Sequence, residues 1–536
     1  MFKAVAESFG YTDENIKKVI KETSQKTGES EEKVRDVLED ALQKTQTKCI
    51  ERSKLKLKDY QTRAVQHMQI NRGLIISFGV GSGKTLTAVS ILACLKAQAK
   101  FFNKKIKIIV VTPTSLQTNF KKEMQAYGMS EGSINHVQFY TIASFANALT
   151  RNELVCDHNT LLIIDEAHEF KKDYRGEFST IGISKGDTDT RAYKAITCAK
   201  KVWKTVLLTA TPLYNAPHDI VNLVAMAKGK SPMTFSEFHK SIQDSDTLRE
   251  YYGCVFSFYT PPQENYPTLN TKLALIDMSN DYNRNYNNIM YRIGSKKRQK
   301  LLTKVGYRAE DWTKRRTKTP GESEEVKNSF MIALRKASND LEPCQKCDYV
   351  MDIVKSGEKT IIFSEFITSG IDILKKKFDD AKIKYLEIKG NVSKAKRDQI
   401  VKDINDPDPK KPTVLFITKA GGQGLDLKRI KHVILFEVGW TESTADQVIG
   451  RARRYKSHDD LPENQRNVTV HRLMTITRED RQLLQSVNND FVKLLVRYKD
   501  LASADLYLYL YSMKKRMETD AIQERLEKID INHMKC

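Results

Sequence analysis

The chain has 536 residues, of which 40% are hydrophobic and 9% aromatic, so it can bury sizeable cores and wholesale disorder is excluded. Its 89 lysines and arginines outnumber 67 aspartates and glutamates, and the net charge of +22 favours nucleic acid as a partner over an anionic membrane surface. No apolar run reaches about 18 residues, so no transmembrane helix is expected.

The cysteine content bears on the compartment. Eight cysteines in a chain of this length are too few for a disulfide scaffold, which predicts thiols and an intracellular, reducing environment. Cys344 and Cys347 form a lone CxxC pair, and no second pair exists to complete a zinc site, so we expect two ordinary thiols and no structural zinc. Residues 1–18 contain no apolar segment of the secretory type, so no signal peptide is expected.

The first 54 residues differ in composition from the rest of the chain. They are rich in glutamate and lysine and contain no proline, which predicts short helices with Thr12 and Ser30 as N-caps. This segment is expected to form a helical appendage or, equally, a solvated arm.

Short apolar runs then alternate with helical stretches. Continuous valine, isoleucine and leucine runs separated by helices are typical of strands in a parallel sheet. Five such runs occur in the first half of the chain, at residues 73–78, 106–113, 136–142, 160–165 and 205–209. Five more occur in the second half, at residues 360–363, 384–388, 413–417, 432–436 and 468–473. The pattern predicts an α/β protein with two lobes of this kind.

The domain boundaries follow from this rhythm, which is lost between residues 230 and 349. The predicted domains are a helical N-terminal appendage at 1–54, a lobe 1 at 55–229, a connecting basic and helical insertion at 230–349, a lobe 2 at 350–500 and a helical tail at 501–536.

The insertion holds the densest basic stretch of the chain. Residues 281–320 contain 12 lysines and arginines against 3 acids. The stretch is either a mobile solvated loop or a nucleic-acid contact made by residues such as Lys296, Lys297 and Arg298. Four aromatic residues that could stack on bases interleave with these charges: Tyr282, Tyr286, Tyr291 and Trp312.

A phosphate-binding loop follows the first predicted strand. Residues 78–85 read FGVGSGKT and precede a helical run, which is the setting that a P-loop needs. Glycines let backbone N–H groups turn toward a triphosphate at a helix N-terminus. Phe78 stands where the strict pattern has glycine. The residues expected around ATP are Phe78, Gly79, Val80, Gly81, Ser82, Gly83, Lys84 and Thr85, with Lys84 on the β- and γ-phosphates and Thr85 on Mg²⁺.

An acidic pair ends the fourth predicted strand. The sequence LLIIDEAH places Asp165 and Glu166 at the carboxyl end of a strand, the edge at which parallel sheets bind ligands. Asp165 is expected to hold Mg²⁺, and Glu166 is expected to activate the attacking water.

Together these motifs resemble superfamily 2 helicases and translocases with DEAH-box lettering. Further segments that match the family, in its order, are residues 57–61, 112–116, 209–212, 418–427 and 447–454. The resemblance implies two tandem RecA-like lobes, ATP hydrolysis to ADP and phosphate, and a Mg²⁺ cofactor. It also assigns roles to residues: Gln61 on adenine, Gly424 and Asp426 on the nucleotide, Thr112, Pro113, Thr114 and Thr418 on nucleic acid, and Gln447, Arg451 and Arg454 as the arginine-finger motif.

The spacing of the motif at residues 447–454 also has a physical explanation. Gln447, Gly450, Arg451 and Arg454 are spaced i, i+3, i+4 and i+7, so they are expected on one helix face. Planar, permanently charged guanidinium groups suit a γ-phosphate supplied by the other lobe.

Three sequence segments of lobe 2 narrow the resemblance to particular subgroups of the family. AGGQGLDL and HVILFEVGW resemble remodeller-type translocases on duplex DNA, and RARRYKSHDDLPENQR resembles helicases of nucleocytoplasmic large DNA viruses, a group that includes poxvirus nucleoside triphosphatase I and the early transcription factor ATPase subunit. The resemblance implies an ATP-driven motor in viral-type transcription, in the host cytoplasm or the virion, with a transcription complex as a further partner. A strand-separating RNA or DNA helicase, and a nucleotide-regulated scaffold subunit with little turnover, are the alternatives.

Overall fold

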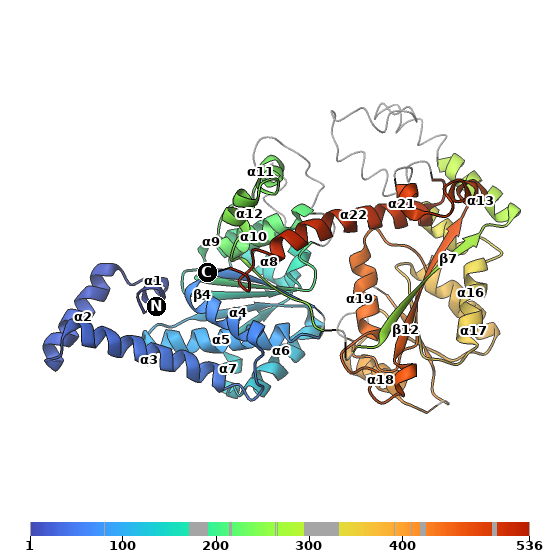
Figure 1. Cartoon of the computed structure of the whole chain (residues 1–536). Helices are drawn as coiled ribbons and strands as arrows, with labels where there is room; N and C mark the ends of the chain where they lie inside the picture. The colour runs from blue at the N-terminus through green and yellow to red at the C-terminus, as the bar shows by residue number, and fades with distance from the viewer. Residues whose placement is uncertain are drawn as a thin grey trace. The chain divides into compact units, whose positions relative to one another are not determined.

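The computed structural model describes residues 2–79, 81–170, 191–213, 217–262, 264, 266–293, 332–390, 392–408, 410–418, 425–495, 501–534 and 536 (Figure 1). The chain divides into two compact units. The first comprises residues 1–261 and 519–536, and the second comprises residues 262–518.

Three helices open the first unit: α1 (Phe2–Ser8), α2 (Asp13–Thr27) and α3 (Glu31–Glu51). Thr12 and Ser30 cap α2 and α3, because each side chain accepts a backbone N–H three residues later. Apolar residues of these helices share a buried cluster with Phe102 at the end of the helix that follows the P-loop. The segment is therefore a packed appendage and not a solvated arm.

The first sheet has six parallel strands in the order β3-β2-β4-β5-β1-β6. The strands are β1 (Gly73–Phe78), β2 (Lys107–Val111), β3 (Val137–Tyr140), β4 (Thr160–Asp165), β5 (Lys204–Thr209) and β6 (Phe256–Tyr259). The helical segments around them are α4 (Asp59–Ile70), α5 (Lys84–Phe101), α6 (Thr114–Tyr127), α7 (Glu131–Asn135), α8 (Ile142–Thr150), η1 (Ala167–Phe170), α9 (Arg191–Lys201), η3 (Pro217–Asp219), α10 (Ile220–Lys228), α11 (Phe235–Ser241) and α12 (Ser245–Tyr252).

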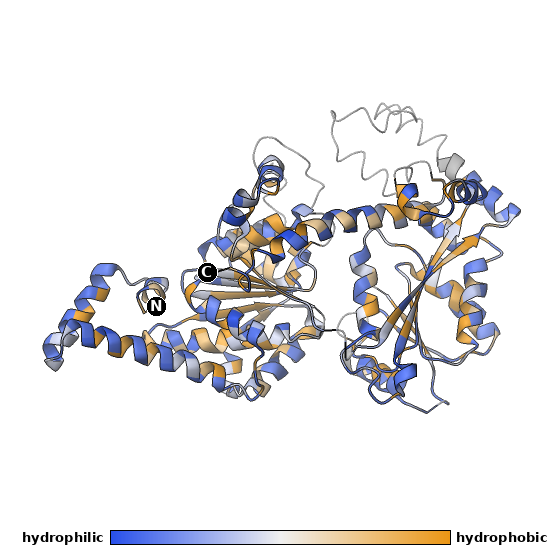
Figure 2. Cartoon of the chain, viewed as in Figure 1, coloured by the Kyte–Doolittle hydropathy of each residue, from blue (hydrophilic) through white to orange (hydrophobic). Residues whose placement is uncertain are grey.

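Apolar cores cover both faces of this sheet. Ile75 of β1 belongs to one buried cluster, while its neighbours Leu74 and Ile76 belong to another, as the alternation of strand side chains requires. The strands therefore need apolar residues at nearly every position, and they appear as an orange layer between the helices in Figure 2. This is the physical reason why the continuous apolar runs predicted a parallel sheet.

The second sheet also has six parallel strands, in the order β7-β12-β11-β8-β10-β9. The strands are β7 (Thr268–Asp277), β8 (Thr360–Phe363), β9 (Tyr385–Ile388), β10 (Val414–Ile417), β11 (His432–Leu435) and β12 (Asn467–Ile476). The helical segments are α13 (Asn280–Ile293), α16 (Gln345–Val354), η6 (Ile367–Ile371), α17 (Asp372–Asp380), α18 (Lys394–Asn405), α19 (Glu442–Ala452), η7 (Glu463–Gln465), α20 (Arg478–Ser486), α21 (Phe491–Leu494) and α22 (Ala504–Glu527). The predicted two-lobed α/β fold is confirmed.

The predicted insertion at 230–349 is not a separate body in its described part. Residues 256–259 form β6, which pairs with β1 in the first sheet, and residues 268–277 form β7, which pairs with β12 in the second. Neither strand could be recognised from the sequence pattern. β6 has only four residues, and β7 is an edge strand whose first six residues are exposed, so it lacks a continuous apolar run.

The tyrosine-rich segment near the C-terminus lies in a helix. α22 places Leu506, Leu508 and Leu510 in a buried cluster of the second unit. Residues from Thr519 onward belong to the first unit, where Leu526 is buried. In the described part of the chain, no helix combines the length and the apolar character that a membrane crossing needs.

The expectation of thiols is wrong, because all eight cysteines are paired. The disulfides are Cys49–Cys94, Cys156–Cys198, Cys254–Cys536 and Cys344–Cys347. Three of them join residues 42 to 282 positions apart, which the fold brings to Cα–Cα distances of 5.2 to 5.8 Å. Sequence spacing cannot show such proximity. The predicted reducing environment rested on free thiols and loses that support.

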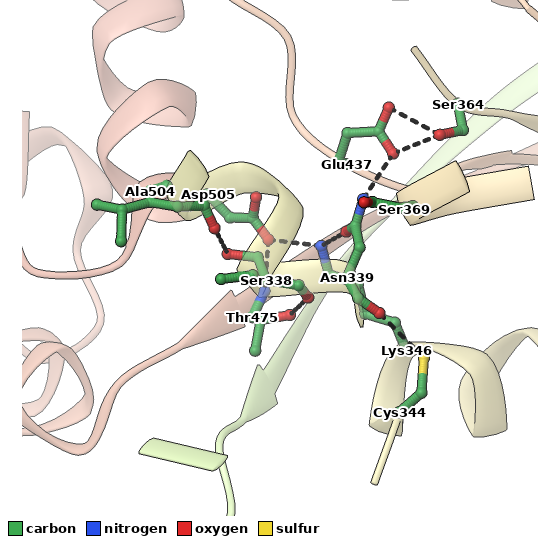
Figure 3. Close-up of polar contacts among 12 residues, drawn as sticks. Ser338, Asn339, Cys344, Lys346, Ser364, Ser369, Glu437, Thr475, Ala504 and Asp505 are labelled. Atoms are coloured by element: carbon green, nitrogen blue, oxygen red, sulfur yellow. Dashed lines mark hydrogen bonds and ion pairs between the residues drawn. The ribbon is translucent and has the colours of Figure 1, made fainter. Parts of the chain in front are cut away.

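A buried polar network lies in the core of the second unit (Figure 3). Lys346 Nζ donates to Asp505 Oδ2 at 2.6 Å, and both side chains are at most 1% exposed. The same ammonium donates to Asn339 Oδ1 at 2.9 Å, and Asn339 Nδ2 donates to Glu437 Oε2 at 3.2 Å. Glu437 also accepts from Ser364 Oγ at 2.9 Å. Every charged group of this network therefore has a partner within the core, as burial requires.

The network predicts a pH effect on stability. Burial raises the pKa of Glu437 from 4.5 to about 7. The folded state therefore binds this proton more tightly than the unfolded state, so the free energy of unfolding falls as the pH rises from about 4.5 to about 7. In Glu437→Gln this contribution is absent, so the stability advantage of the wild type over the variant should shrink between pH 5 and pH 8 in urea titrations. A constant difference would contradict the assignment.

Candidate nucleotide-binding site

The loop between β1 and α5 has the geometry of a phosphate-binding loop. Gly81 and Gly83 adopt φ angles of 80° and 77°, which side chains with a Cβ rarely adopt. Lys84 is the first residue of α5, and its Nζ donates to the carbonyl of Phe78 at 2.8 Å. The ammonium thus lies over the loop, and its contact with the β- and γ-phosphates remains a proposal. Val80 lies outside the described residues.

Helix α4 holds this loop through two side chains. The Tyr60 hydroxyl donates to the carbonyl of Ser82 at 2.8 Å, and Gln61 Nε2 donates to the carbonyl of Gly83 at 3.3 Å. Gln61 Oε1 accepts the backbone N–H of Lys58 at 2.9 Å, so the buried amide joins the start of α4 to the loop. Gln61 lies at the predicted place, and its contact with adenine remains a proposal.

The end of β6 supplies a side of the site that sequence reasoning missed. The rings of Tyr60 and Tyr259 stack with centroids 3.5 Å apart and an interplanar angle of 11°. A Cβ at Gly79 would lie 2.7 Å from the Pro261 side chain, so the loop can pass this close only as glycine. The only sequence signal for this strand was the short aromatic run FSFY. Its pairing with β1 brings Tyr259 next to the loop.

The acidic pair lies at the same edge of the sheet. β4 ends at Asp165, which is buried and accepts the Thr112 hydroxyl at 3.1 Å and the backbone N–H of Glu166 at 3.0 Å. Burial, and next the charge of Glu166, raises the pKa of Asp165, whereas the Lys84 ammonium lowers it. The structure therefore brings Lys84 and both acids together.

Thr112 differs from its predicted role. It was expected to contact nucleic acid, but it is fully buried and its hydroxyl supports Asp165. The reason is the strand order, since β2 is a neighbour of β4 and Thr112 directly follows the end of β2. Thr114, at the start of α6, is exposed, and Pro113 between them is half-buried.

Two further motifs of the first unit meet at this edge. The His168 ring nitrogen Nδ1 lies 3.2 Å from the Thr209 hydroxyl and 3.4 Å from Glu166 Oε2. Thr209 is the last residue of β5, and its Oγ1 accepts the backbone N–H of Thr211 at 3.0 Å. Polar contacts through His168 therefore join the acidic pair to the segment 209–212.

The second unit brings two predicted residues together. Arg454 Nη1 lies 3.3 Å from Asp426 Oδ1, and the Arg454 Nε donates to the carbonyl of Gly450 at 3.3 Å. Thr418 is buried directly after β10. Residues 419–424, with Gly424, and the basic residues Lys296, Lys297 and Arg298 lie outside the described residues.

The predicted single helix face for the arginine motif needs a correction. Gln447 and Arg451 lie within α19, but the helix ends at Ala452 and Arg454 lies beyond it. Arg453 takes φ and ψ of −100° and 84°, and its Nε donates to the carbonyl of Pro267 at 2.9 Å. The contact with Pro267 fixes Arg453, and the ion pair with Asp426 fixes Arg454. Regular helical spacing cannot anticipate either contact.

Comparison with known proteins agrees with these features. The model of the SNF2-related domain matches residues 60–340, and that of the helicase conserved C-terminal domain matches residues 345–456. An ATP-dependent RNA helicase candidate, L538 of Acanthamoeba polyphaga mimivirus, is 28% identical over 439 residues, which cover 78% of this chain and 89% of the relative. Nucleoside triphosphatase I of Heliothis armigera entomopoxvirus is 24% identical, covering 91% and 86%.

Solved structures also match this chain. The Sulfolobus solfataricus SWI2/SNF2 ATPase core in complex with dsDNA shares 18% identity and has a TM-score of 0.31, covering 88% of this chain and 97% of that one. The two parallel sheets of the present chain establish the fold without it.

The position of Glu166 generates a prediction about turnover. Glu166→Gln should lower ATP hydrolysis at least about a hundredfold, because a base of this kind contributes roughly 10²–10⁴ in rate. ATP affinity should stay unchanged, whereas Lys84→Ala should weaken it. Rates and nucleotide titrations are compared with Glu169→Gln, a neighbouring acid on η1. Near-wild-type hydrolysis in Glu166→Gln would contradict its role.

Proposed function

This chain belongs to the SNF2-related family of ATPases, and on that basis we propose that it is an ATP-driven motor that translocates on duplex DNA. The observation that carries the proposal is the convergence of Lys84, Asp165 and Glu166 at one edge of the first sheet, where β1 and β4 end. Such an edge binds and hydrolyses a nucleoside triphosphate.

The chemistry follows from the residues at this edge. Water attacks the γ-phosphorus, the bond to the ADP oxygen breaks, and Glu166 accepts the proton of the water. Lys84 stabilises the charge that develops on the phosphate oxygens. The reaction yields ADP and inorganic phosphate.

Thr85 and Asp165 are the residues that would hold Mg²⁺. Both offer oxygen, the ligand that this ion prefers. Burial and the neighbouring Glu166 charge raise the pKa of Asp165, and a divalent cation would offset both effects. When bound, Mg²⁺ supplies positive charge to the β- and γ-phosphates.

The second unit would contribute the arginines. Arg451 and Arg454 are proposed to stabilise the γ-phosphate in the transition state when the two lobes close around ATP, with Gln447 beside them. In the structure Arg454 pairs with Asp426, whose side chain is 67% exposed. We infer that its guanidinium exchanges this carboxylate for phosphate during closure, so that ATP favours the closed state and hydrolysis releases it.

The proposal that nucleic acid is the substrate is supported by the charge of the chain and by its similarity to known proteins. The net charge of +22 suits a polyanion, and Thr114, Pro113, Thr418 and the basic residues 296–298 are proposed contacts. The similarity to nucleoside triphosphatase I of an entomopoxvirus supports hydrolysis of a nucleoside triphosphate, and the role in viral transcription is proposed from the resemblance of lobe 2 to helicases of large DNA viruses. The similarity to a mimivirus protein named as an RNA helicase candidate supports RNA unwinding as a second candidate.

Parallel assays on the purified chain test the substrate. Duplex DNA should stimulate ATP hydrolysis more than single-stranded DNA or RNA of the same length and concentration. A translocation assay that displaces a triplex-forming strand should report movement without separation of the duplex. Stimulation by RNA alone, with unwinding, would select the helicase alternative. Absence of hydrolysis with every nucleic acid would select the scaffold alternative.

The proposed finger generates a separate prediction. Arg454→Ala should leave ATP affinity intact but lower nucleic-acid-stimulated kcat at least about a hundredfold, a discount on the roughly 10³–10⁵ that such arginines contribute. The matched control is Arg429→Ala, which removes another arginine ion-paired in this unit, to Asp460. Normal kcat in both Arg454→Ala and Arg451→Ala would show that the first unit hydrolyses ATP without help.

A further inference from the structure

Helix α19, which carries Gln447 and Arg451, is bound along one side by α22. Ser512 Oγ of α22 donates to Glu442 Oε1 at 2.9 Å, and Arg516 Nη1 lies 3.3 Å from Asp446. Glu442 and Asp446 are four residues apart on α19, and Ser512 and Arg516 are four residues apart on α22. Two successive turns of one helix therefore face two successive turns of the other.

The inner half of this contact is nearly buried. Glu442 Oε2 also accepts from Arg472 Nη2 of β12 at 2.7 Å, and these two side chains are only 10% and 12% exposed. Asp446 and Arg516 form the outer half, with side chains 41% and 47% exposed, and Arg516 Nη1 also lies 3.9 Å from Glu442 Oε2. Glu442 is thus a nearly buried carboxylate with two cationic partners, Arg472 and Arg516, and is held more firmly than a surface ion pair.

Helix α22 is itself fixed at its first turn. Asp505 accepts the buried Lys346 ammonium at 2.6 Å and the backbone N–H of Thr475 at 2.9 Å (Figure 3). The backbone N–H of Ala504 donates to the Tyr286 hydroxyl at 2.8 Å. Because Ser512 follows Asp505 by two helical turns, this anchor sets where the side chains that bind α19 lie.

The same network reaches the start of α19 from the other side. Glu437, which accepts from Asn339 Nδ2, precedes the N-cap Thr441 by four residues. The entry of α19 and its acidic side are thus both tied to the buried core, while Arg451 lies in its last turn. A rotation of the helix about its axis would move the Arg451 side chain, and the contacts with α22 oppose such a rotation.

We propose that Arg516 and Asp446 are positioning residues for ATP hydrolysis, which hold α19 in the rotation that presents its arginine to the γ-phosphate. This inference rests on the proposed arginine-finger function. Neither residue touches nucleotide in this scheme. They act through the orientation of the helix, so their loss should change kcat and spare ATP and DNA binding.

Charge exchange is the sharpest test. Arg516→Asp should lower duplex-stimulated kcat about tenfold, a moderate loss because Ser512 and Arg472 still hold Glu442. The KM for ATP, the Kd for duplex DNA and the thermal midpoint should stay within error of wild type. Asp446→Arg should behave alike, and the double exchange Arg516→Asp with Asp446→Arg should restore most of the rate. Arg516→Lys, which keeps the charge, should retain more activity than Arg516→Ala.

The control is Arg481→Ala, which breaks a different arginine ion pair of the same unit, with Asp277, away from α19. It should leave kcat unchanged. Wild-type kcat in Arg516→Asp overturns the proposal. A loss of kcat that the double exchange fails to rescue also overturns it. So does a loss of kcat in a variant whose thermal midpoint has fallen to the assay temperature, because unfolding then explains the loss. If Arg454→Ala and Arg451→Ala are themselves fully active, the arginine-finger function has failed and the positioning role fails with it.

Discussion

Parallel pairing of β1 with β5 is the constraint on which the nucleotide site depends. Parallel strands deliver all their carboxyl ends to one edge, so the P-loop after β1, the acidic pair after β4 and Thr209 at the end of β5 meet there although up to about 130 residues separate them. The side chains then complete the site. Lys84 lies over the loop, and Thr112 reaches Asp165 because β2 is the neighbour of β4. An antiparallel strand in this order would carry its end residues to the opposite edge.

The proposed role of the second unit requires that its long cationic side chains are held in place before they meet a phosphate. The core of this unit contains a buried ammonium, two buried carboxylates and an amide that are hydrogen-bonded to one another. Such a network contributes little net stability compared with apolar packing, but it permits few alternative arrangements. It fixes the start of α22 and the approach to α19, so the elements that carry Arg451 and Arg454 are positioned by interactions that do not involve ATP.

The differences between prediction and structure share a physical origin. β7 is an exposed edge strand, so it has no need of the apolar run that marks a buried strand, and it was assigned to an insertion. Arg454 leaves the predicted helix face because Arg453 donates to the carbonyl of Pro267 and Arg454 pairs with Asp426, and these tertiary contacts compete with one more helical turn. Six of the eight cysteines pair because helices and loops that are distant in sequence pack side by side. In each case a long-range contact decides, and local pattern carries no trace of it.

By itself the sequence determined the α/β class, the two lobes and the residues of the nucleotide edge, because buried parallel strands and a phosphate-binding loop impose local rules on composition and spacing. Lys84 and Asp165 could be named from those rules alone, whereas Gln61 was named from the resemblance to superfamily 2 helicases and translocases. Only the tertiary structure decided that Tyr259 and Pro261 border the loop, that Thr112 supports an acid and faces no solvent, and that α22 holds α19. These depend on strand order and helix docking, which arise from the packing of whole elements and leave no periodic signal in the residues that make the contacts.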